Sequence, residues 1–133
     1  MNIKHVLLID DNEADNYISE FVLRESAFAK KISMTTSAKE ALDLLISLKR
    51  DTEEFPDLIF LDIRMPVMDG FEFLEKLMQF PEAVKNQCTV IMLSSSNDQK
   101  DIARALQYPV VKKFLTKPLE SEMLLNLKQL KIT

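Results

Sequence analysis

The sequence predicts a doubly wound α/β domain, in which helices cover both faces of a five-stranded parallel sheet. Five short segments with the length and composition of strands alternate with five segments whose apolar residues recur at helical spacing. This alternation is typical of parallel strands joined by right-handed helical crossovers. A chain of 133 residues has the size of one domain with a single core. We therefore expect one domain over residues 1–133 and no effector domain.

The strand candidates also predict the order of the sheet. Four are nearly unbroken apolar runs, as in strands buried on both faces, whereas Lys31–Thr35 alternates like an edge strand covered on one face. With this strand at the edge, the expected order is 2-1-3-4-5, a flavodoxin-like arrangement that binds ligands between the first and third strands. The four apolar runs are Val6–Ile9, Leu58–Leu61, Val90–Leu93 and Val110–Leu115.

Helical spacing predicts the first two helices. An apolar stripe over residues 14–22 indicates the first, and Tyr17 and Phe21 are expected to pack within it against the sheet. The second stripe runs from Ala38 to Leu48, directly after Ser37, which stands where a helix N-cap is expected. Both helices should cover the sheet with their apolar faces.

Three further helices complete the alternation. Phe71–Met78 forms the third, with Phe71 and Phe73 as packing residues, and it must end before Pro81. Asp98–Leu106 is a shorter and more polar candidate for the fourth. The last is predicted from Pro118 to about Leu130, with proline in its first turn.

The composition narrows the function classes. The formal net charge is −4 and the pI is near 5.1, whereas a nucleic-acid surface needs clustered Lys and Arg, so no nucleic acid is expected as a partner. No apolar run is long enough for a signal peptide or a membrane span, so we expect a cytoplasmic protein without a membrane partner. The single glycine, Gly70, excludes the glycine-rich loops of dinucleotide and P-loop sites.

The single cysteine and the single histidine are expected to have structural and not catalytic roles. Cys88 has no second cysteine to pair with and precedes an apolar run, so it is expected to be a small buried hydrophobe. His5 is the only histidine and precedes the first predicted strand, so a surface position is expected and not a catalytic one. Neither residue indicates zinc or redox chemistry.

Polar residues follow four of the strands at the edge where ligands should bind. Asp10 and Asp11 end the first strand, Asp62 ends the third, Ser94 ends the fourth, and Lys117 follows the fifth. Because the carboxyl ends of parallel strands share one edge, these side chains should form one site. Three carboxylates this close would repel one another unless a cation lay between them, and a hard divalent ion such as Mg²⁺ suits oxygen ligands.

Such a site could carry out phosphoryl chemistry. A bound cation would let one carboxylate act as a nucleophile and hold a phosphoryl group as an acyl phosphate. The ammonium of Lys117 and the hydroxyl of Ser94 would then contact the phosphoryl oxygens, where charge develops. An ordinary alternative stays open: aspartates at strand ends and the serines 94–96 can simply cap the helices that follow.

The segment Leu61–Gly70 resembles the phosphoacceptor segment of response-regulator receiver domains. Asp10-Asp11, Ser94 and Lys117-Pro118 stand where that family has its acidic pair, its hydroxyl and its lysine, and the resemblance covers essentially the whole chain. It implies a chemotaxis-type single-domain regulator that is phosphorylated on Asp62 and catalyses only its own phosphorylation and dephosphorylation.

The resemblance also implies roles for individual residues. Asp11 and Asp62 would bind Mg²⁺ directly together with the carbonyl of Arg64, and Asp10 would act mainly through water. The bond between Lys117 and Pro118 would be cis. Phe114 occupies the position of the family's switch aromatic, so it and Ser94 are expected to respond to phosphorylation, although Phe114 could equally be an ordinary core residue.

Partners follow from the same resemblance. The phosphodonor would be a sensor histidine kinase or a histidine phosphotransfer protein, and a downstream protein target would recognise the phosphorylated surface. The chain departs from the usual pattern at Ser94 and Ser95 and at Tyr108-Pro109. Together with Arg64, Ser95 stands where the family tunes the lifetime of the phosphoryl group.

Two other functions remain as alternatives. A Mg²⁺-dependent phosphohydrolase of the haloacid-dehalogenase type also uses an aspartate nucleophile, but it needs a second aspartate two positions later, where this chain has Arg64. A phosphorylation-independent, receiver-like interaction module would keep the fold without the chemistry. The intact set of acidic residues and lysine favours the phosphorylated receiver over this module.

Overall fold

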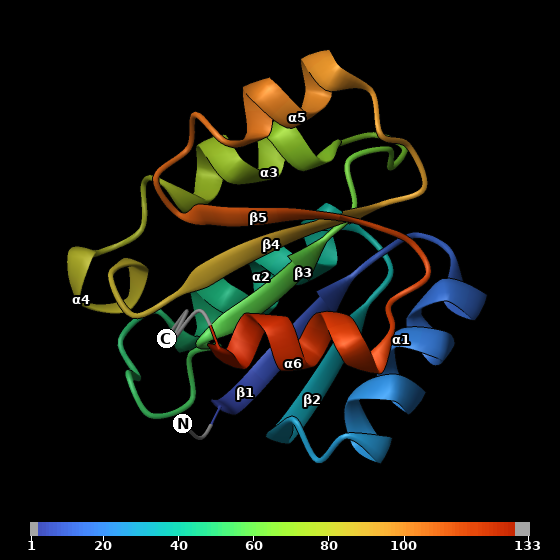
Figure 1. Ribbon diagram of the computed structural model, residues 1–133. Helices are drawn as coiled ribbons and strands as arrows, with labels where there is room; N and C mark the ends of the chain where they lie inside the picture. The colour runs from blue at the N-terminus through green and yellow to red at the C-terminus, as the bar shows by residue number, and fades with distance from the viewer. Residues whose placement is uncertain (1–2, 130–133) are drawn as a thin grey trace.

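A computed structural model describes residues 3–129, which form a five-stranded parallel sheet between two layers of helices (Figure 1). The strand order is β2-β1-β3-β4-β5, as predicted, and every neighbouring pair is parallel. The topological switch point therefore lies between β1 and β3. The strands are β1 (Ile3–Ile9), β2 (Ala29–Thr35), β3 (Leu58–Leu61), β4 (Thr89–Ser94) and β5 (Val111–Thr116).

Helices cover both faces of the sheet. Helices α1 and α6 lie on one face, and α2, α3 and α5 lie on the other (Figure 1). Within the described residues the helices are α1 (Glu13–Glu25), α2 (Ala38–Leu48), α3 (Gly70–Leu77), α4 (Glu82–Lys85), α5 (Gln99–Ala105) and α6 (Ser121–Gln129). The prediction of five helices was wrong by one, because α4 is a single turn of four residues and too short to show an apolar stripe.

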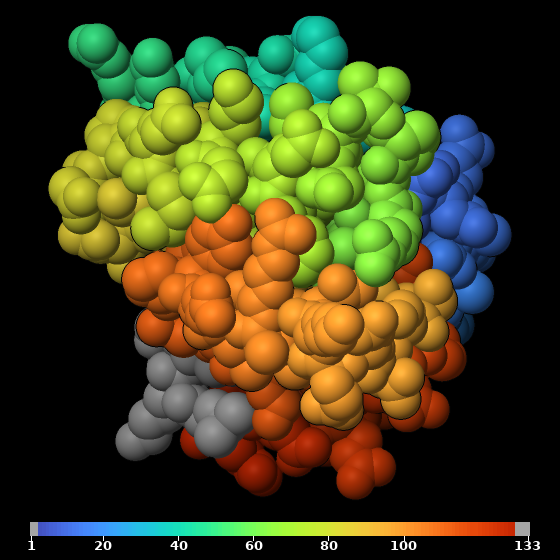
Figure 2. Space-filling view, turned by 90° about the horizontal axis from the view of Figure 1, so that it is seen from above, coloured from blue at the N-terminus to red at the C-terminus, as the bar shows by residue number. Residues whose placement is uncertain are grey.

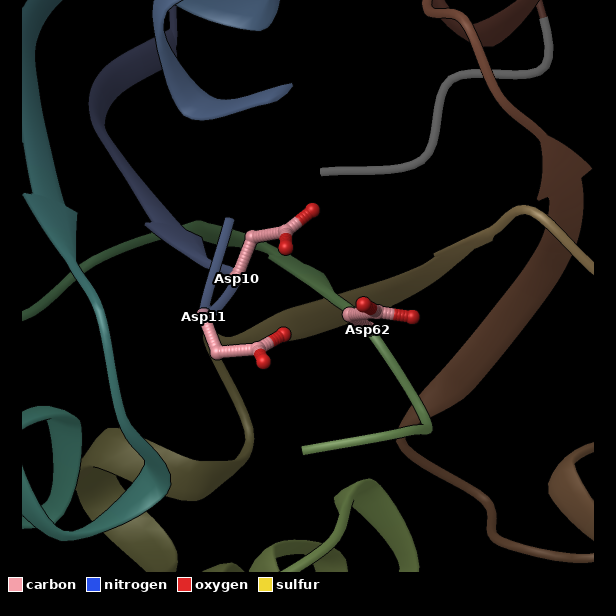
Figure 3. Close-up of side chains that lie close together, drawn as sticks. All are labelled: Asp10, Asp11 and Asp62. Atoms are coloured by element: carbon pink, nitrogen blue, oxygen red, sulfur yellow. The ribbon is translucent and has the colours of Figure 1, made fainter. Parts of the chain in front are cut away.

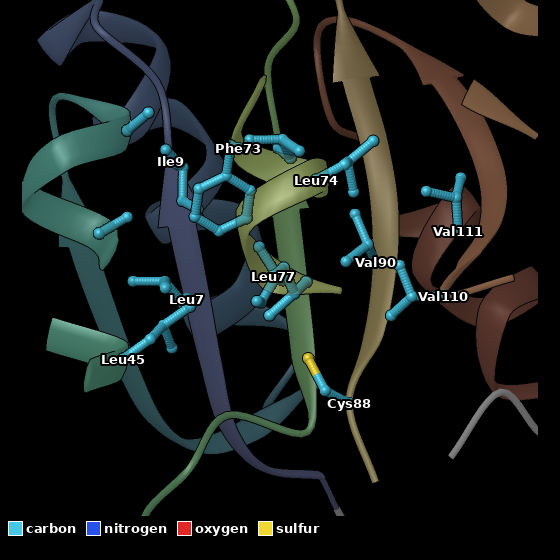
Figure 4. Packing of buried hydrophobic residues seen from close by; sticks show 14 of the residues in the cluster. Leu7, Ile9, Leu45, Phe73, Leu74, Leu77, Cys88, Val90, Val110 and Val111 are labelled. Carbon is cyan, nitrogen blue, oxygen red and sulfur yellow. The ribbon is translucent and has the colours of Figure 1, made fainter. Parts of the chain in front are cut away.

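Two apolar cores flank the sheet. The larger lies under α2, α3 and α5 and contains alternate residues of β1, β3 and β4 (Figure 4). The smaller contains the residues of the same strands that point toward α1 and α6. Strands with apolar residues on both faces explain why the sequence shows unbroken apolar runs. Cys88, Phe71 and Phe73 are buried in the larger core, as predicted.

Helix α1 presents a different face to the sheet from the one predicted. Tyr17 is 68% exposed and Phe21 is 58% exposed, so both expectations of packing were wrong. The buried residues of α1 are instead Asn16, Ser19 and Leu23. The amide of Asn16 donates hydrogen bonds to the backbone carbonyls that follow β1 and end β2, at 3.0 Å each. These hydrogen bonds fix the rotation of α1 about its axis, and Tyr17 and Phe21 therefore face solvent.

His5 is buried, so the prediction of a surface position was also wrong. Strand β1 begins at Ile3 and includes His5, which is only 2% exposed. Its ring nitrogens lie 2.7 Å from the carbonyl of Glu54 and 2.8 Å from the hydroxyl of Ser33. Because both nitrogens have partners, the ring is accommodated as a structural residue between β1 and its neighbours.

The segment between β5 and the last helix agrees with one sequence-based expectation and differs from another. The peptide bond between Lys117 and Pro118 is cis, as the resemblance implied. Helix α6 begins at Ser121 and not at Pro118, and the predicted end near Leu130 lies outside the described residues. No helix in the part of the chain that the structure describes is long and apolar enough to cross a bilayer.

Helices α3 and α5 lie side by side on the outer surface of the larger core (Figure 2). Contacts between side chains join these helices and the loops next to them. Arg64 forms an ion pair with Asp101 at 2.6 Å. The guanidinium of Arg104 lies over the ring of Phe71, 4.0 Å from its centroid. The hydroxyl of Tyr108 donates a hydrogen bond to Glu75 at 2.5 Å. The loop after Asp62 is thereby tied to α5.

Candidate functional site

Three aspartates converge at the carboxyl edge of the sheet, at the switch point. Asp10 and Asp11 follow β1, and Asp62 follows β3, whose last residue pairs with the last residue of β1. One carboxylate oxygen of each residue lies within 4.8 Å of the others (Figure 3). Asp10 and Asp62 are each only 6% exposed, whereas Asp11 faces solvent. The sheet order thus brings together the carboxylates that the sequence predicted.

The ammonium of Lys117 lies between the buried carboxylates. Its Nζ is 2.5 Å from Oδ2 of Asp10 and 3.2 Å from Oδ2 of Asp62. It is also 2.9 Å from Oδ2 of Asp15 in the first turn of α1, a contact that sequence reasoning missed. Acidic residues are common in the first turn of a helix because they interact favourably with the helix dipole. The position of Asp15 in the sequence therefore did not indicate a contact with Lys117.

Backbone amides fix the orientation of both buried carboxylates. Oδ1 of Asp62 accepts a hydrogen bond from the N–H of Ile63 at 2.8 Å, and Oδ1 of Asp10 accepts one from the N–H of Asn12 at 2.9 Å. The second oxygen of each carboxylate faces Lys117. Each carboxylate therefore has one oxygen held by the backbone and one directed toward the site.

Burial and nearby charges set the protonation of the site. Burial raises the pKa of Asp62, the charge of Lys117 opposes this increase, and the charge of Asp10 adds to it. Burial by itself lowers the pKa of Lys117, but hydrogen bonds to Asp10 and Asp15, with the charges of the nearby carboxylates, outweigh it and raise the pKa overall. The lysine therefore stays protonated at neutral pH.

The three-carboxylate cluster has the donor chemistry for Mg²⁺. Oxygen ligands about 2.1 Å from such an ion are about 3 Å apart at adjacent corners of an octahedron and about 4.2 Å apart at opposite corners. Carboxylate oxygens within 4.8 Å of one another can reach these separations with small rotations. One ammonium leaves a net negative charge on the three carboxylates, which further favours a divalent ion.

Ser94 lies at the end of β4 and is 1% exposed. Its Oγ accepts a hydrogen bond from the N–H of Ser96 at 3.1 Å, and its carbonyl accepts one from the N–H of Lys117 at 2.7 Å. The alternative that this serine run caps the following helix was wrong, because Asp98 caps α5. The hydroxyl hydrogen of Ser94 thus remains able to donate to a ligand.

Gly70 positions the loop that carries Asp62. A Cβ built at this position would lie 2.6 Å from the carbonyl oxygen of Asp62 and 3.0 Å from Cα of Ile63. The N–H of Gly70 also donates to the carbonyl of Ile63 at 2.8 Å. Only glycine permits this close approach, so Gly70 has a role that sequence reasoning used merely to exclude other loops.

Comparison with known proteins identifies the family. The family described as the response regulator receiver domain matches residues 6–129 of the chain. The chain belongs to the response-regulator receiver family. Receiver domains as a class accept a phosphoryl group on an aspartate and bind Mg²⁺ at an acidic pocket, and this chain has an acidic cluster at Asp10, Asp11 and Asp62.

Solved receiver structures share the whole fold. A two-component response regulator from Cytophaga hutchinsonii is 32% identical, with a TM-score of 0.90 over 99% of this chain and 98% of that one. A response regulator receiver protein from Dyadobacter fermentans DSM 18053 is 33% identical, with a TM-score of 0.82 over 95% and 96% of the two chains. These similarities confirm the predicted flavodoxin-like receiver fold.

Curated relatives include plant regulators. The two-component response regulator ORR11 of Oryza sativa subsp. japonica is 34% identical over 86% of this chain and 71% of its own length. ORR1 of the same rice is 30% identical over 90% of this chain and 52% of its own length. The receiver chain thus spans about half the length of ORR1.

In this receiver the remaining predicted residues are placed as follows. Arg64 is exposed in the loop after Asp62, where its guanidinium pairs with Asp101. Phe114 is half-buried on β5 and packs against the larger core. The binding of Mg²⁺ by the Arg64 carbonyl and the movement of Phe114 stay predictions.

Proposed function

We propose that this receiver domain accepts a phosphoryl group on Asp62 in a Mg²⁺-dependent reaction and signals by phosphorylation-dependent protein binding. The donor is a sensor histidine kinase or a histidine phosphotransfer protein, the classes that phosphorylate receiver domains. The observation that carries the proposal is the ammonium of Lys117, shared between Asp10 and Asp62 beside a third carboxylate. This arrangement places one cationic donor beside an oriented carboxylate and leaves a net negative charge that a divalent ion can balance.

Each residue has a distinct role in the transfer. A carboxylate oxygen of Asp62 attacks phosphorus, and the new O–P bond forms as the P–N bond to the donor imidazole breaks and the imidazole leaves with the electron pair. Lys117 donates to a phosphoryl oxygen, and the hydroxyl of Ser94 donates to another. Asp11 and Asp62, with the carbonyl of Arg64, would hold Mg²⁺, and Asp10 would act on the ion mainly through water.

The bound ion supplies positive charge that screens the phosphoryl group from the carboxylates. After transfer, the hydrogen bond from Ser94 to the phosphoryl group biases the loop that leads to α5. Phe114, on the neighbouring strand β5, responds to the same shift, and the surface around α5 and β5 changes for a downstream target.

The test is the intact mass of the protein after incubation with acetyl phosphate and Mg²⁺. Wild type should gain the mass of one phosphoryl group, whereas Asp62→Asn and wild type with a chelator should gain none. No adduct on wild type, together with no beryllofluoride complex, would contradict the proposal. That result would support the phosphorylation-independent interaction module instead.

A further inference from the structure

Three carboxylates share the ammonium of Lys117, and they are not equivalent. An ammonium has three N–H donors, and the three contacts to Asp10, Asp15 and Asp62 use all of them. The lysine side chain is only 12% exposed, so these contacts and not water satisfy most of its charge. Any ligand that takes one carboxylate away must leave the ammonium another partner.

Asp15 lies outside the cluster that suits Mg²⁺. The cluster comprises Asp10, Asp11 and Asp62, whereas Asp15 approaches the lysine from the first turn of α1. Its place is fixed by the N-cap of that helix, because its backbone N–H donates to Oδ1 of Asn12 at 3.0 Å. Asp15 is therefore held in place as an acceptor for the ammonium that does not belong to the Mg²⁺ cluster.

Mg²⁺ and Lys117 compete for the same two buried carboxylates. An ion that draws an oxygen of Asp62 directly and one of Asp10 through water would weaken the electrostatic attraction of both carboxylates for the ammonium. The lysine has room on the side of Asp15, where a cavity of about 200 Å³ is lined by Asp15, Ser95, Lys117 and Pro118, among others. The contact to Asp15 can thus persist while the ion is bound.

We infer that Asp15 is a positioning residue, which holds Lys117 at the edge of the site so that the lysine and Mg²⁺ can be accommodated together. This inference rests on the proposed function. Without Asp15, the ammonium has only the carboxylates that the ion needs, so it stays on them and opposes metal binding. The ammonium also loses the contact with α1 that holds it in position to meet the incoming phosphoryl group.

The test compares Mg²⁺ affinity with phosphorylation rate in Asp15→Asn. Titration calorimetry with MgCl₂ alone should show a dissociation constant about three to ten times higher than in wild type, the size expected for a partly buried ion pair. The rate of phosphorylation by acetyl phosphate at saturating Mg²⁺ should fall by a similar factor. Asp15→Glu keeps the carboxylate and should restore most of both values.

Glu13→Gln is the matched control, because it removes one negative charge from the same first turn at an exposed position. It should leave the affinity and the rate near wild type. In a Lys117→Met background, Asp15→Asn should have little further effect on Mg²⁺ affinity, since its action passes through the lysine. Thermal unfolding without metal checks that each variant is folded.

Three results would overturn the inference. These are wild-type affinity and rate in Asp15→Asn, an equal loss in Glu13→Gln, or an undiminished effect of Asp15→Asn in the Lys117→Met background. If Asp15→Asn fails to fold, Asp15→Ser replaces it as the variant without the carboxylate, and its Mg²⁺ affinity and phosphorylation rate are compared with those of Asp15→Glu. A wild type that binds Mg²⁺ but gains no phosphoryl group would refute the proposed function alone, because the calorimetric comparison needs no phosphodonor.

Discussion

The carboxylate of Asp62 owes its position to its neighbours along the chain. Its N–H donates to the carbonyl of Ile9, its Oδ1 accepts from Ile63, and its own carbonyl lies against Gly70. The side chain is therefore fixed at the end of β3 before any ligand arrives. Preorganisation of this kind lowers the cost of aligning the nucleophile with phosphorus.

At Gly70, substitution by alanine should disturb both stability and chemistry. A methyl group 2.6 Å from the carbonyl oxygen of Asp62 requires the backbone to shift, because the obstructing atoms are backbone and cannot rotate away. We expect Gly70→Ala to lower the free energy of unfolding by about 1–3 kcal/mol, in spite of the helix propensity of alanine. Urea denaturation measures the loss, and a stability equal to wild type would refute the close contact.

The thiol of Cys88 should be unreactive in the folded protein. Burial, and then the charge of Asp57, raises its pKa to about 12. At pH 8 the thiol is thus protonated as well as covered, and a disulfide reagent such as Ellman's should label it at a small fraction of the rate of a free thiol. In 8 M urea the same reagent should label one thiol per chain rapidly. Fast labelling under native conditions would contradict this burial.

The positions of the candidate site residues were predictable where they depend on strand ends. Ser94 ends a strand and the other four residues, Asp10, Asp11, Asp62 and Lys117, directly follow strands, so the sheet order alone indicates that they meet. Tertiary contacts to residues on helices and loops carry no such signal. Asp15 reaches Lys117 through the orientation of α1, and the buried ring of His5 has hydrogen-bond partners in the carbonyl of Glu54 and the hydroxyl of Ser33.

Among the elements, α1 shows how polar contacts can override an apolar stripe. Its aromatic residues suggested one buried face, but Asn16 bonds to the ends of two strands and sets a different one. Periodicity cannot reveal this choice, because a buried asparagine and a surface asparagine look alike in sequence. Periodicity succeeded for α2 and α3, whose apolar residues alone face the core.

A matched pair of substitutions tests the orientation of α1. Phe73 on α3 is fully buried, whereas Phe21 on α1 is 58% exposed. Phe73→Ala should lower the free energy of unfolding by about 3–5 kcal/mol, because it leaves a cavity in the core. Phe21→Ala should cost less than about 1 kcal/mol. Urea denaturation of the two variants side by side gives both values, and similar losses would show that the aromatic stripe of α1 is buried after all.

For the whole molecule, the sequence order of strands and helices was sufficient to predict the topology. Alternation required a parallel sheet, and one alternating strand identified the edge. Helix α4 and the start of α6 were not predictable in the same way, because one is a single turn and the other depends on the loop after Lys117. The order of the sheet that assembles the site was correct, whereas the errors concern connections between elements, the face of α1 that is buried, and the burial of His5.

The balance of charge at the site couples it to the stability of the whole domain. Lys117→Met would leave Asp10 and Asp62 buried and facing each other without a cation. In the presence of a chelator we expect the free energy of unfolding to fall by about 1–3 kcal/mol. Lys112→Met, at an exposed position near the opposite end of β5, should cost far less and serves as the control.

Addition of Mg²⁺ should reverse this loss, because an ion that binds only the folded site stabilises it by about 2.7 kcal/mol at one hundred times its dissociation constant. The gain should be larger in Lys117→Met than in wild type, since the lysine no longer competes with the ion for Asp10 and Asp62. Urea denaturation followed by circular dichroism, with MgCl₂ or with chelator, measures all four values. Equal gains from Mg²⁺ in the two proteins would mean that the ion and the lysine do not share these carboxylates, and that the buried cluster tolerates both cations independently.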